Sequence, residues 1–547
     1  MTGKELFQQT TSLDKIVEIL RRRVQPAAMF LILSQLGSSN QENSDVFRSD
    51  FIKHMDALLG QVVIERSEDA DTVACVRQHV HQLVHNRPIY FPQGLFAMWK
   101  YILVHCESPT PPSSQEVYEQ YKMVFPLCMR FGDVLSEQSR GGPVDLFQAF
   151  VFGERPNFEQ SLMRTLVLYC VIARQAERYK QDFFDFQTVF QDKYGVSLLD
   201  YITALFGLYA MWKQKTGDVG GKIREDWYQS ISTAFEKTAI AHIVADVIQP
   251  LCFTFEEGKG AFTNNVSEPW DFKFFHDHPL YLFPGDSVIP VNLPVLEYAL
   301  TEGLFWKIRA CFSQDDLRFQ NFFGKPLELY VFDTVSGACK QSSSTYVIYP
   351  EIKFGPKKSR HDSPDVIVRA GNKVIAIEVK AKRLRYEASV VKGDLASIQS
   401  DQRLMTIEPM QQLYGRMRQI LNHECAEINL DGVTELHLVS ATLGEFPHIP
   451  PFEDETRRSW SELHGIHQTV YLHRMSIEDV EVLSGLLTRR SKSVFAVLRE
   501  ASKNPYISFR RYVFDRGIAA RNPQVFQKEM AELLKAAAAD IFRVQSI

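Results

Sequence analysis

Two short runs of β-branched and aliphatic residues, separated by a glycine–asparagine pair, constrain the fold of this chain more than any other sequence feature. The runs are Asp365 to Arg369 and Lys373 to Ala381, and Gly371-Asn372 lies between them. A glycine–asparagine pair is suited to the tight two-residue turn of a β-hairpin. With these two residues as the turn, Ala370 pairs with Lys373, and every other cross-strand pair follows from that one. The sequence therefore predicts a β-hairpin whose register is set by its turn.

In this register two carboxylates face each other across the hairpin, Asp365 on the first strand and Glu378 on the second. Opposed residues hold their Cβ atoms about 4.5–5.5 Å apart, and two carboxylates at ~5 Å repel by about 3 kcal/mol at an effective dielectric constant of ~20. A bound cation would offset this repulsion. Two carboxylates, the backbone carbonyl of Val379 and water are oxygen ligands of the kind that Mg²⁺ prefers, so the hairpin predicts a site for Mg²⁺ or Mn²⁺. Lys380 lies on the same strand face as Glu378, where it could orient water and stabilise charge on a phosphate.

The segments around the hairpin are typical of a mixed sheet flanked by helices. One strand precedes the hairpin, and a helix, two more strands and a second helix follow it. They are predicted at Thr345 to Ile352, Pro409 to Asn422, Glu435 to Ala441, Thr469 to His473 and Ile477 to Leu487. Ser476 and Asp479 form a capping box at the start of the last helix.

These residues resemble the PD-(D/E)XK phosphodiesterase superfamily, the restriction-endonuclease-like fold of many restriction, repair, recombination and phage-defence nucleases. Pro364-Asp365 matches the PD of its motif, and Glu378-Val379-Lys380 matches the ExK. The order of helix, three strands, helix and strand also matches the family core, over residues of about 315–485. The resemblance implies that Asp365 and Glu378 are metal ligands and that Lys380 is the catalytic lysine of a Mg²⁺-dependent endonuclease or phosphodiesterase.

Two further site residues are implied by the resemblance. The family often has an additional acid on the helix before the first strand, which implies Glu328 as a metal ligand. Many members also carry a glutamine on the helix after the lysine, where Gln411 or Gln412 could serve, and we take Gln412 as the supporting residue. The spacing departs from the QxxxY form of some members, because Arg416 is the fourth residue after Gln412.

The rest of the chain predicts a helical first half and a basic tail. Residues 1–256 carry apolar residues three and four apart between breaks that contain proline or glycine, and Glu225 to Val247 is one such segment. Gly258 to Pro269 is the clearest loop. We therefore expect an α+β multidomain chain: a helical domain at 1–256, a nuclease-like domain with a mixed central sheet flanked by helices at 270–490, and a basic helical C-terminal segment at 491–547. The size of the helical domain favours a sensor, partner-binding or regulatory role.

Positive charge is concentrated in two stretches of a chain whose net charge is −5. Residues 351–385 sum to +6 and residues 489–521 to +7, which leaves −18 for the remainder. Such stretches are the electrostatic footprint of phosphate binding, and a solvated surface is the alternative. The predicted contacts to a nucleic-acid backbone are Lys353, Lys357, Lys358, Arg360, Lys382, Arg383 and Arg385.

Cysteine spacing and hydropathy indicate the compartment. The eight cysteines stand at least twenty residues apart, without a CxxC pair, which predicts reduced thiols in a cytoplasmic protein. The longest apolar runs are shorter than the 18 or more residues that a membrane span needs, so no membrane partner is expected.

The function predicted from these features is metal-dependent hydrolysis of phosphodiester bonds in nucleic acid, with DNA favoured over RNA, in antiviral (phage) defence or DNA processing. Two alternatives stay open. One is a catalytically inactive scaffold that keeps the nuclease fold and binds nucleic acid, and the other is a protein-interaction module whose basic segments dock an acidic partner. Salt-dependent DNA binding would exclude the last, and metal-dependent cleavage would separate the first two.

Overall fold

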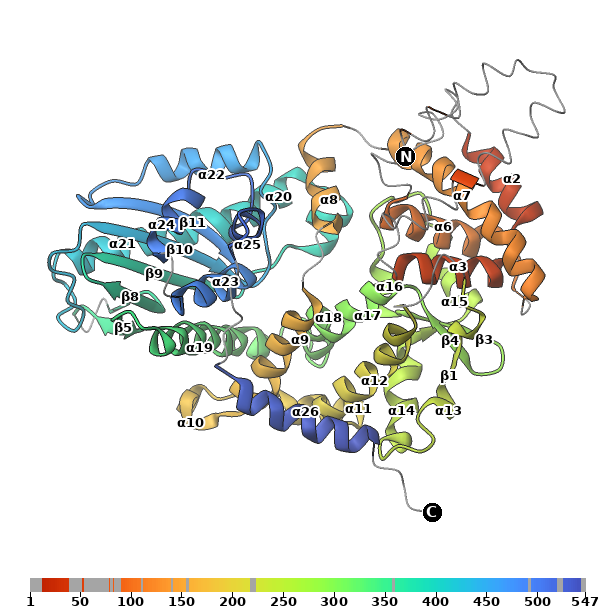
Figure 1. Ribbon diagram of the computed structural model, residues 1–547, viewed down its shortest axis with the longest axis horizontal. Helices are drawn as coiled ribbons and strands as arrows, with labels where there is room; N and C mark the ends of the chain where they lie inside the picture. Colours follow the sequence, from red (N-terminus) through yellow and green to blue (C-terminus); the bar gives the residue numbers. More distant parts are fainter. Residues whose placement is uncertain are drawn as a thin grey trace.

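The fold is α+β, with two lobes that differ in secondary structure (Figure 1). One lobe holds a five-stranded sheet with helices on both faces, and the other is built almost entirely of helices. The computed structural model describes residues 12–38, 52–53, 78, 82, 90–109, 112–138, 141–153, 157–216, 223–356, 360–489, 493–518 and 525–542.

The five-stranded sheet is mixed and has the strand order β11-β10-β9-β8-β5. Its strands are β5 (Val347–Pro350), β8 (Val366–Ala370), β9 (Lys373–Lys380), β10 (Glu435–Thr442) and β11 (Thr469–Ser476). Strands β5, β8 and β9 are antiparallel neighbours, whereas β9, β10 and β11 run parallel. The pairs from Ala370↔Lys373 to Val366↔Ile377 confirm the predicted register of the hairpin.

Both faces of this sheet are covered, which explains why β9 is buried from Val374 to Val379. Helix α21 (Glu408–Leu421) packs on the face that carries Val374 and Ala376. Helices α19 (Arg318–Gln341) and α23 (Ile477–Leu487) pack on the opposite side of the sheet. The predicted capping box of α23 is confirmed, because Ser476 and Asp479 exchange hydrogen bonds with each other's backbone N–H groups.

The core of the helical lobe is rich in aromatic side chains. Phe30 stacks on Trp99 with ring centroids 4.1 Å apart, and Tyr281 lies 4.9 Å from Phe30. The helices of this lobe are α2 (Leu13–Arg23), α3 (Pro26–Ser38), α6 (Pro92–His105), α7 (Ser114–Gln138), α9 (Phe158–Leu166), α10 (Ala176–Tyr179), α11 (Phe186–Tyr194), α12 (Leu198–Thr216), α13 (Ile231–Ala234), α14 (Ala241–Ile248), α15 (Phe255–Phe262), α16 (Lys273–Asp277), α17 (Leu293–Leu300) and α18 (Glu302–Arg309).

A small sheet within the helical lobe includes a hairpin formed by its two four-residue strands. Its order is β1-β4-β3-β2, with β1 (Gln229–Ser230), β2 (Cys252–Phe253), β3 (Leu280–Phe283) and β4 (Ser287–Pro290). The segment from Glu225 to Val247 was predicted as one helix, and that prediction is wrong because β1 pairs with β4 and interrupts it.

The expected loop from Gly258 to Pro269 also differs from the structure in its first part. Helix α15 continues through Phe262, because Thr254 and Glu257 form a capping box and Phe255 and Phe262 are buried. The segment is therefore part of the helical lobe's core.

The C-terminal residues pack on both lobes. Helices α24 (Val494–Ala501) and α25 (Phe509–Asp515) contact α23, whereas α26 (Gln527–Phe542) returns to the helical lobe and packs against α12 (Figure 1). In the part of the chain that the structure describes, no single helix could cross a membrane, and only the bent pair α11–α12, with 63° between its members, reaches the required length. The seven cysteines among the described residues are free thiols.

Candidate active site

The hairpin brings the three predicted catalytic residues together at one end of β8 and β9. Asp365 immediately precedes β8, and its Oδ2 accepts a 2.6 Å hydrogen bond from the backbone N–H of Val379. Glu378 is only 2% exposed, and its Oε1 accepts a 2.7 Å hydrogen bond from the Lys380 ammonium group. The Lys380 side chain is 29% exposed, so solvent reaches this lysine although the Glu378 carboxylate that it binds is buried.

Further carboxylates crowd this site. Burial raises the pKa of Glu328, on α19, to about 7, and the negative charge of Glu351 adds to the increase. Burial also raises the pKa of Asp365 well above its usual range, with further contributions from Glu378 and Glu328. The Val379 N–H opposes this increase because it stabilises the Asp365 carboxylate. The site is therefore rich in carboxyl groups, and the negative charge of one raises the pKa of another.

Glu351 is a member of the site that the sequence motif does not include. It follows β5 directly, and burial raises its pKa, with contributions from Asp362 and then Glu378. Its position next to the first strand of the sheet is the sequence signal that could have identified it.

Arg416 is the second missed residue, and it comes from α21. Its Nη1 lies 3.4 Å from each of the two carboxylate oxygens of Glu378, and its side chain is 19% exposed. Arg416 is one helical turn beyond Gln412, so the two residues share a helix face. Within the described residues, Gln412 itself makes no hydrogen bond to these carboxylates. The spacing of four residues from Gln412 is the signal that could have identified Arg416.

The donor set fits a hard divalent cation in chemical type, because it consists of carboxylate and carbonyl oxygens. Among the residues that the structure describes, however, no group of three or more His, Cys, Asp or Glu side chains is arranged to hold a metal ion. Two of the predicted ligands are engaged by donors of the protein itself. Glu378 is bound to Lys380 and Arg416, and Asp365 is bound to the Val379 N–H.

The predicted phosphate-binding residues differ in their exposure to solvent and in their contacts within the protein. Lys353, Arg360 and Lys382 are exposed, and Lys353 lies 3.9 Å from Asp362. The other two lysines predicted to bind phosphate, Lys357 and Lys358, lie outside the described residues.

Arg383 and Arg385 are used within the protein. The Arg383 guanidinium lies 4.6 Å from the centroid of the Phe305 ring and donates a hydrogen bond to the backbone carbonyl of Glu302. Arg385 pairs with the buried Asp401 at 2.7 Å. Their intramolecular contacts indicate structural roles for both arginines.

Two arginines of the second basic stretch form ion pairs with acids of the same lobe. Arg499 Nη2 lies 2.9 Å from Glu435, and Arg510 Nη1 lies 2.7 Å from Glu445. These bridges cross between segments far apart in the sequence. The expected phosphate-binding role of residues 489–521 is therefore not supported at these two arginines.

Comparisons of this chain with models of protein families, with curated proteins and with solved structures give no match. The interpretation of the site therefore depends on the residues and the geometry described above.

Proposed function

We propose that this chain is a metal-dependent nuclease of the PD-(D/E)XK type, which hydrolyses phosphodiester bonds of nucleic acid, with DNA as the favoured candidate substrate. The observation that carries the proposal is the hairpin geometry. Its register matches the predicted one, Asp365 accepts a hydrogen bond from the Val379 N–H, next to Glu378 in the chain, and Lys380 lies 2.7 Å from Glu378.

Each residue of the site would have a distinct role. Asp365 and Glu378 would hold Mg²⁺ or Mn²⁺, with Glu328 and the Val379 carbonyl as further oxygen donors. The bound metal supplies Lewis acidity, which activates water and stabilises the leaving oxygen. Lys380, whose side chain is partly exposed beside Glu378, would donate a hydrogen bond to the attacking water or to a non-bridging phosphate oxygen.

Arg416 adds a permanent positive charge to the same site. A guanidinium binds phosphate with two parallel hydrogen bonds, and its contacts of 3.4 Å with Glu378 are long for charge-assisted hydrogen bonds. Arg416 could therefore exchange this carboxylate for a substrate phosphate, which would keep the nucleic-acid backbone next to the metal ligands.

The test is cleavage by the full chain. Single- and double-stranded DNA and RNA are incubated with Mg²⁺, Mn²⁺ or EDTA, and the variants Asp365→Ala, Glu378→Ala and Lys380→Ala should each lose cleavage with unchanged circular dichroism. Glu387→Ala is the matched control, because Glu387 is a surface carboxylate with 74% side-chain exposure. Wild-type cleavage by the Glu378 variant would contradict the assignment.

The second candidate function is a nucleic-acid-binding scaffold without catalysis. The observation in its favour is that Lys380 and Arg416 both contact Glu378, so the buried carboxylate is already balanced by the protein's own cations. Salt-dependent DNA binding without cleavage in either metal would establish this function instead.

A further inference from the structure

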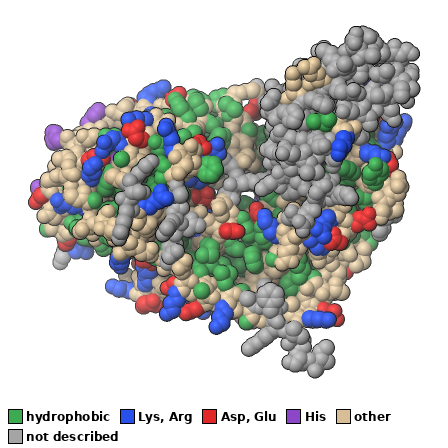
Figure 2. All heavy atoms as spheres, viewed as in Figure 1, with side chains coloured by type: hydrophobic (Ala, Val, Ile, Leu, Met, Phe, Trp, Pro, Cys, Tyr) green, Lys and Arg blue, Asp and Glu red, His purple; other side chains and the backbone are tan. Residues whose placement is uncertain are grey.

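A cavity of about 320 Å³ lies between the two lobes, and its lining includes none of the three predicted catalytic residues. One wall comes from α8 (Pro143–Gly153) and α9, a second from α17 and α18, and a third from loops of the sheet lobe. In Figure 2, apolar side chains gather at the middle of this face, over the region where Figure 1 places α9 and α18. The volume is within the range of small-molecule sites, which occur preferentially at domain interfaces.

The sheet-lobe wall lies at the carboxyl ends of the three parallel strands. Arg383 and Leu384 follow β9, Glu445 follows β10, and Ser476 ends β11 and begins α23. In open α/β sheets, ligands bind in the crevice beyond the carboxyl ends of the strands. The position of the cavity therefore agrees with where such sheets bind ligands.

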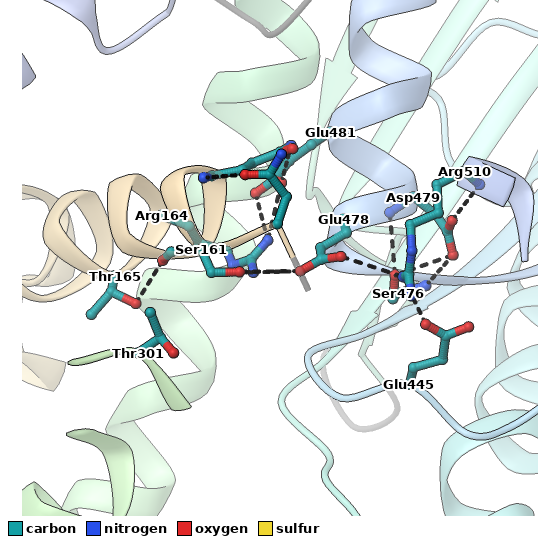
Figure 3. Close-up of polar contacts among 12 residues, drawn as sticks. Ser161, Arg164, Thr165, Thr301, Glu445, Ser476, Glu478, Asp479, Glu481 and Arg510 are labelled. Atoms are coloured by element: carbon teal, nitrogen blue, oxygen red, sulfur yellow. Dashed lines mark hydrogen bonds and ion pairs between the residues drawn. The ribbon is translucent and has the colours of Figure 1, made fainter. Parts of the chain in front are cut away.

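The polar side of the cavity is a chain of ion pairs (Figure 3). Arg164 Nη2 lies 3.2 Å from Glu478, Arg510 Nη1 lies 3.4 Å from the other oxygen of Glu478, and the same Arg510 nitrogen lies 2.7 Å from Glu445. Arg164 also binds the buried Glu481 at 2.9 Å. Because carboxylates already engage these guanidinium groups, a phosphate would have to displace a protein carboxylate in order to bind here.

Two more carboxylates line the cavity. Glu297 accepts a hydrogen bond from the Tyr209 hydroxyl, and Glu302 is exposed. Within the described part of the chain, neither forms an ion pair, so both are available as hydrogen-bond acceptors. The lining residues carry four carboxylates and three guanidinium groups, a balance that disfavours an anionic ligand.

The apolar side of the cavity is aromatic. It is lined by Phe152, Phe158, Tyr298, Trp306 and Tyr386, and Trp306 is 43% exposed. Trp306 and Glu302 are four residues apart on α18, so an aromatic face and a carboxylate lie on the same side of that helix. Flat rings stack on aromatic side chains with offset or edge-to-face geometry.

We propose that this cavity binds an uncharged purine nucleoside. The base would stack on the aromatic side, its N–H groups would donate to Glu297 or Glu302, and its sugar hydroxyls would bind the ion-pair chain. An apolar ligand would cover the carboxylates of Glu297 and Glu302 without adding a hydrogen bond to either, and a nucleotide would bring a phosphate to a wall with an excess of carboxylates. The inference goes beyond the proposed nuclease function and does not depend on it, because binding itself is measured.

The experiment is isothermal titration calorimetry of the full chain with guanosine, adenosine and their 5′-monophosphates, in the presence of EDTA. We expect one or both nucleosides to bind, and each 5′-monophosphate to bind at least about tenfold more weakly than its nucleoside. Trp306→Ala and Glu297→Gln should each weaken nucleoside binding about tenfold or more. Tyr118→Ala, which removes an aromatic side chain that is 57% exposed on α7, is the control and should bind like the wild type.

Three results would overturn the proposal. They are the absence of binding by both nucleosides, tighter binding of the monophosphates, and unchanged affinity in both the Trp306 and the Glu297 variants. Thermal unfolding of each variant shows that it is folded, and Trp306 is exposed enough for its truncation to leave the core intact. If the wild-type protein cleaves no nucleic acid, the proposed nuclease function fails, but these binding results still decide the nucleoside proposal.

Discussion

The buried guanidinium of Arg164 provides the sharpest test of how the two lobes hold together. Its side chain is 11% exposed, and it binds both oxygens of Glu481, at 2.9 and 3.0 Å, as well as Glu478. Glu481 is 2% exposed and also accepts a hydrogen bond from Tyr330. The Arg164→Met variant keeps much of the side-chain volume and leaves Glu481 without its cation. Removing one partner of a buried ion pair costs about 3–5 kcal/mol, which is the loss of unfolding free energy that we expect.

The loss should depend on pH in a defined direction. Burial raises the pKa of Glu481 in the folded protein, and Arg164 opposes that increase. Without Arg164 the folded-state pKa rises further above the unfolded value, so the carboxyl group destabilises the fold increasingly as pH rises through that interval. Arg164→Met should therefore lose less stability at pH 5 than at pH 8.

The assay is urea denaturation at both pH values, with two comparison variants. Arg164→Met/Glu481→Gln should recover a large part of the loss, because the unpaired charge is gone. Arg178→Met is the matched control: Arg178 binds Asp333 at 2.6 Å, but the two side chains are 27% and 23% exposed, so we expect a loss of about 1 kcal/mol or less. Equal losses in the Arg164 and Arg178 variants, or no pH dependence, would refute the reasoning.

Three further predictions concern the candidate active site. Arg416→Ala should weaken DNA binding in EDTA and lower the slope of log affinity against log salt concentration by about 0.9, as expected for the loss of one phosphate contact. Arg418, which is exposed on the same helix, is the control, and Arg418→Ala should change the slope less. Equal slopes for the two variants in fluorescence anisotropy would exclude the Arg416 contact. Because burial and Glu351 raise the folded-state pKa of Glu328 to about 7, the metal-free protein should lose stability as pH rises from about 5 to 7, and Glu328→Gln should reduce this slope in thermal unfolding. Millimolar Mg²⁺ or Mn²⁺ should raise the melting temperature, and Glu378→Gln should reduce the rise; calorimetry without a metal-linked shift in the wild type would contradict this prediction.

The parts of the fold that could be predicted are those that residues close together in the sequence determine. Gly371 has a φ of 59°, the left-handed conformation that glycine readily supplies in a tight turn, and that turn sets the hairpin register. Capping by Ser476 and Asp479 likewise involves residues three apart. Arg416 and Glu351 have only indirect signals in the sequence, the spacing from Gln412 and the position after the first strand, because they reach the site through the packing of α21 and the end of β5.

The two basic stretches of the sequence are less basic on the folded surface than their sums indicate, because charge that is segregated along a chain need not be segregated in space. Arg499 and Arg510 belong to the stretch of +7, yet each binds an acid on or just after β10 in the folded lobe. In the first stretch, Lys353, Arg360 and Lys382 remain exposed. A nucleic acid would therefore meet fewer free cations than the sequence sums indicate, and positioning would depend more on groups inside the site. Under the proposed nuclease function, the substrate would therefore be held mainly at the scissile phosphate, with a modest salt dependence of binding.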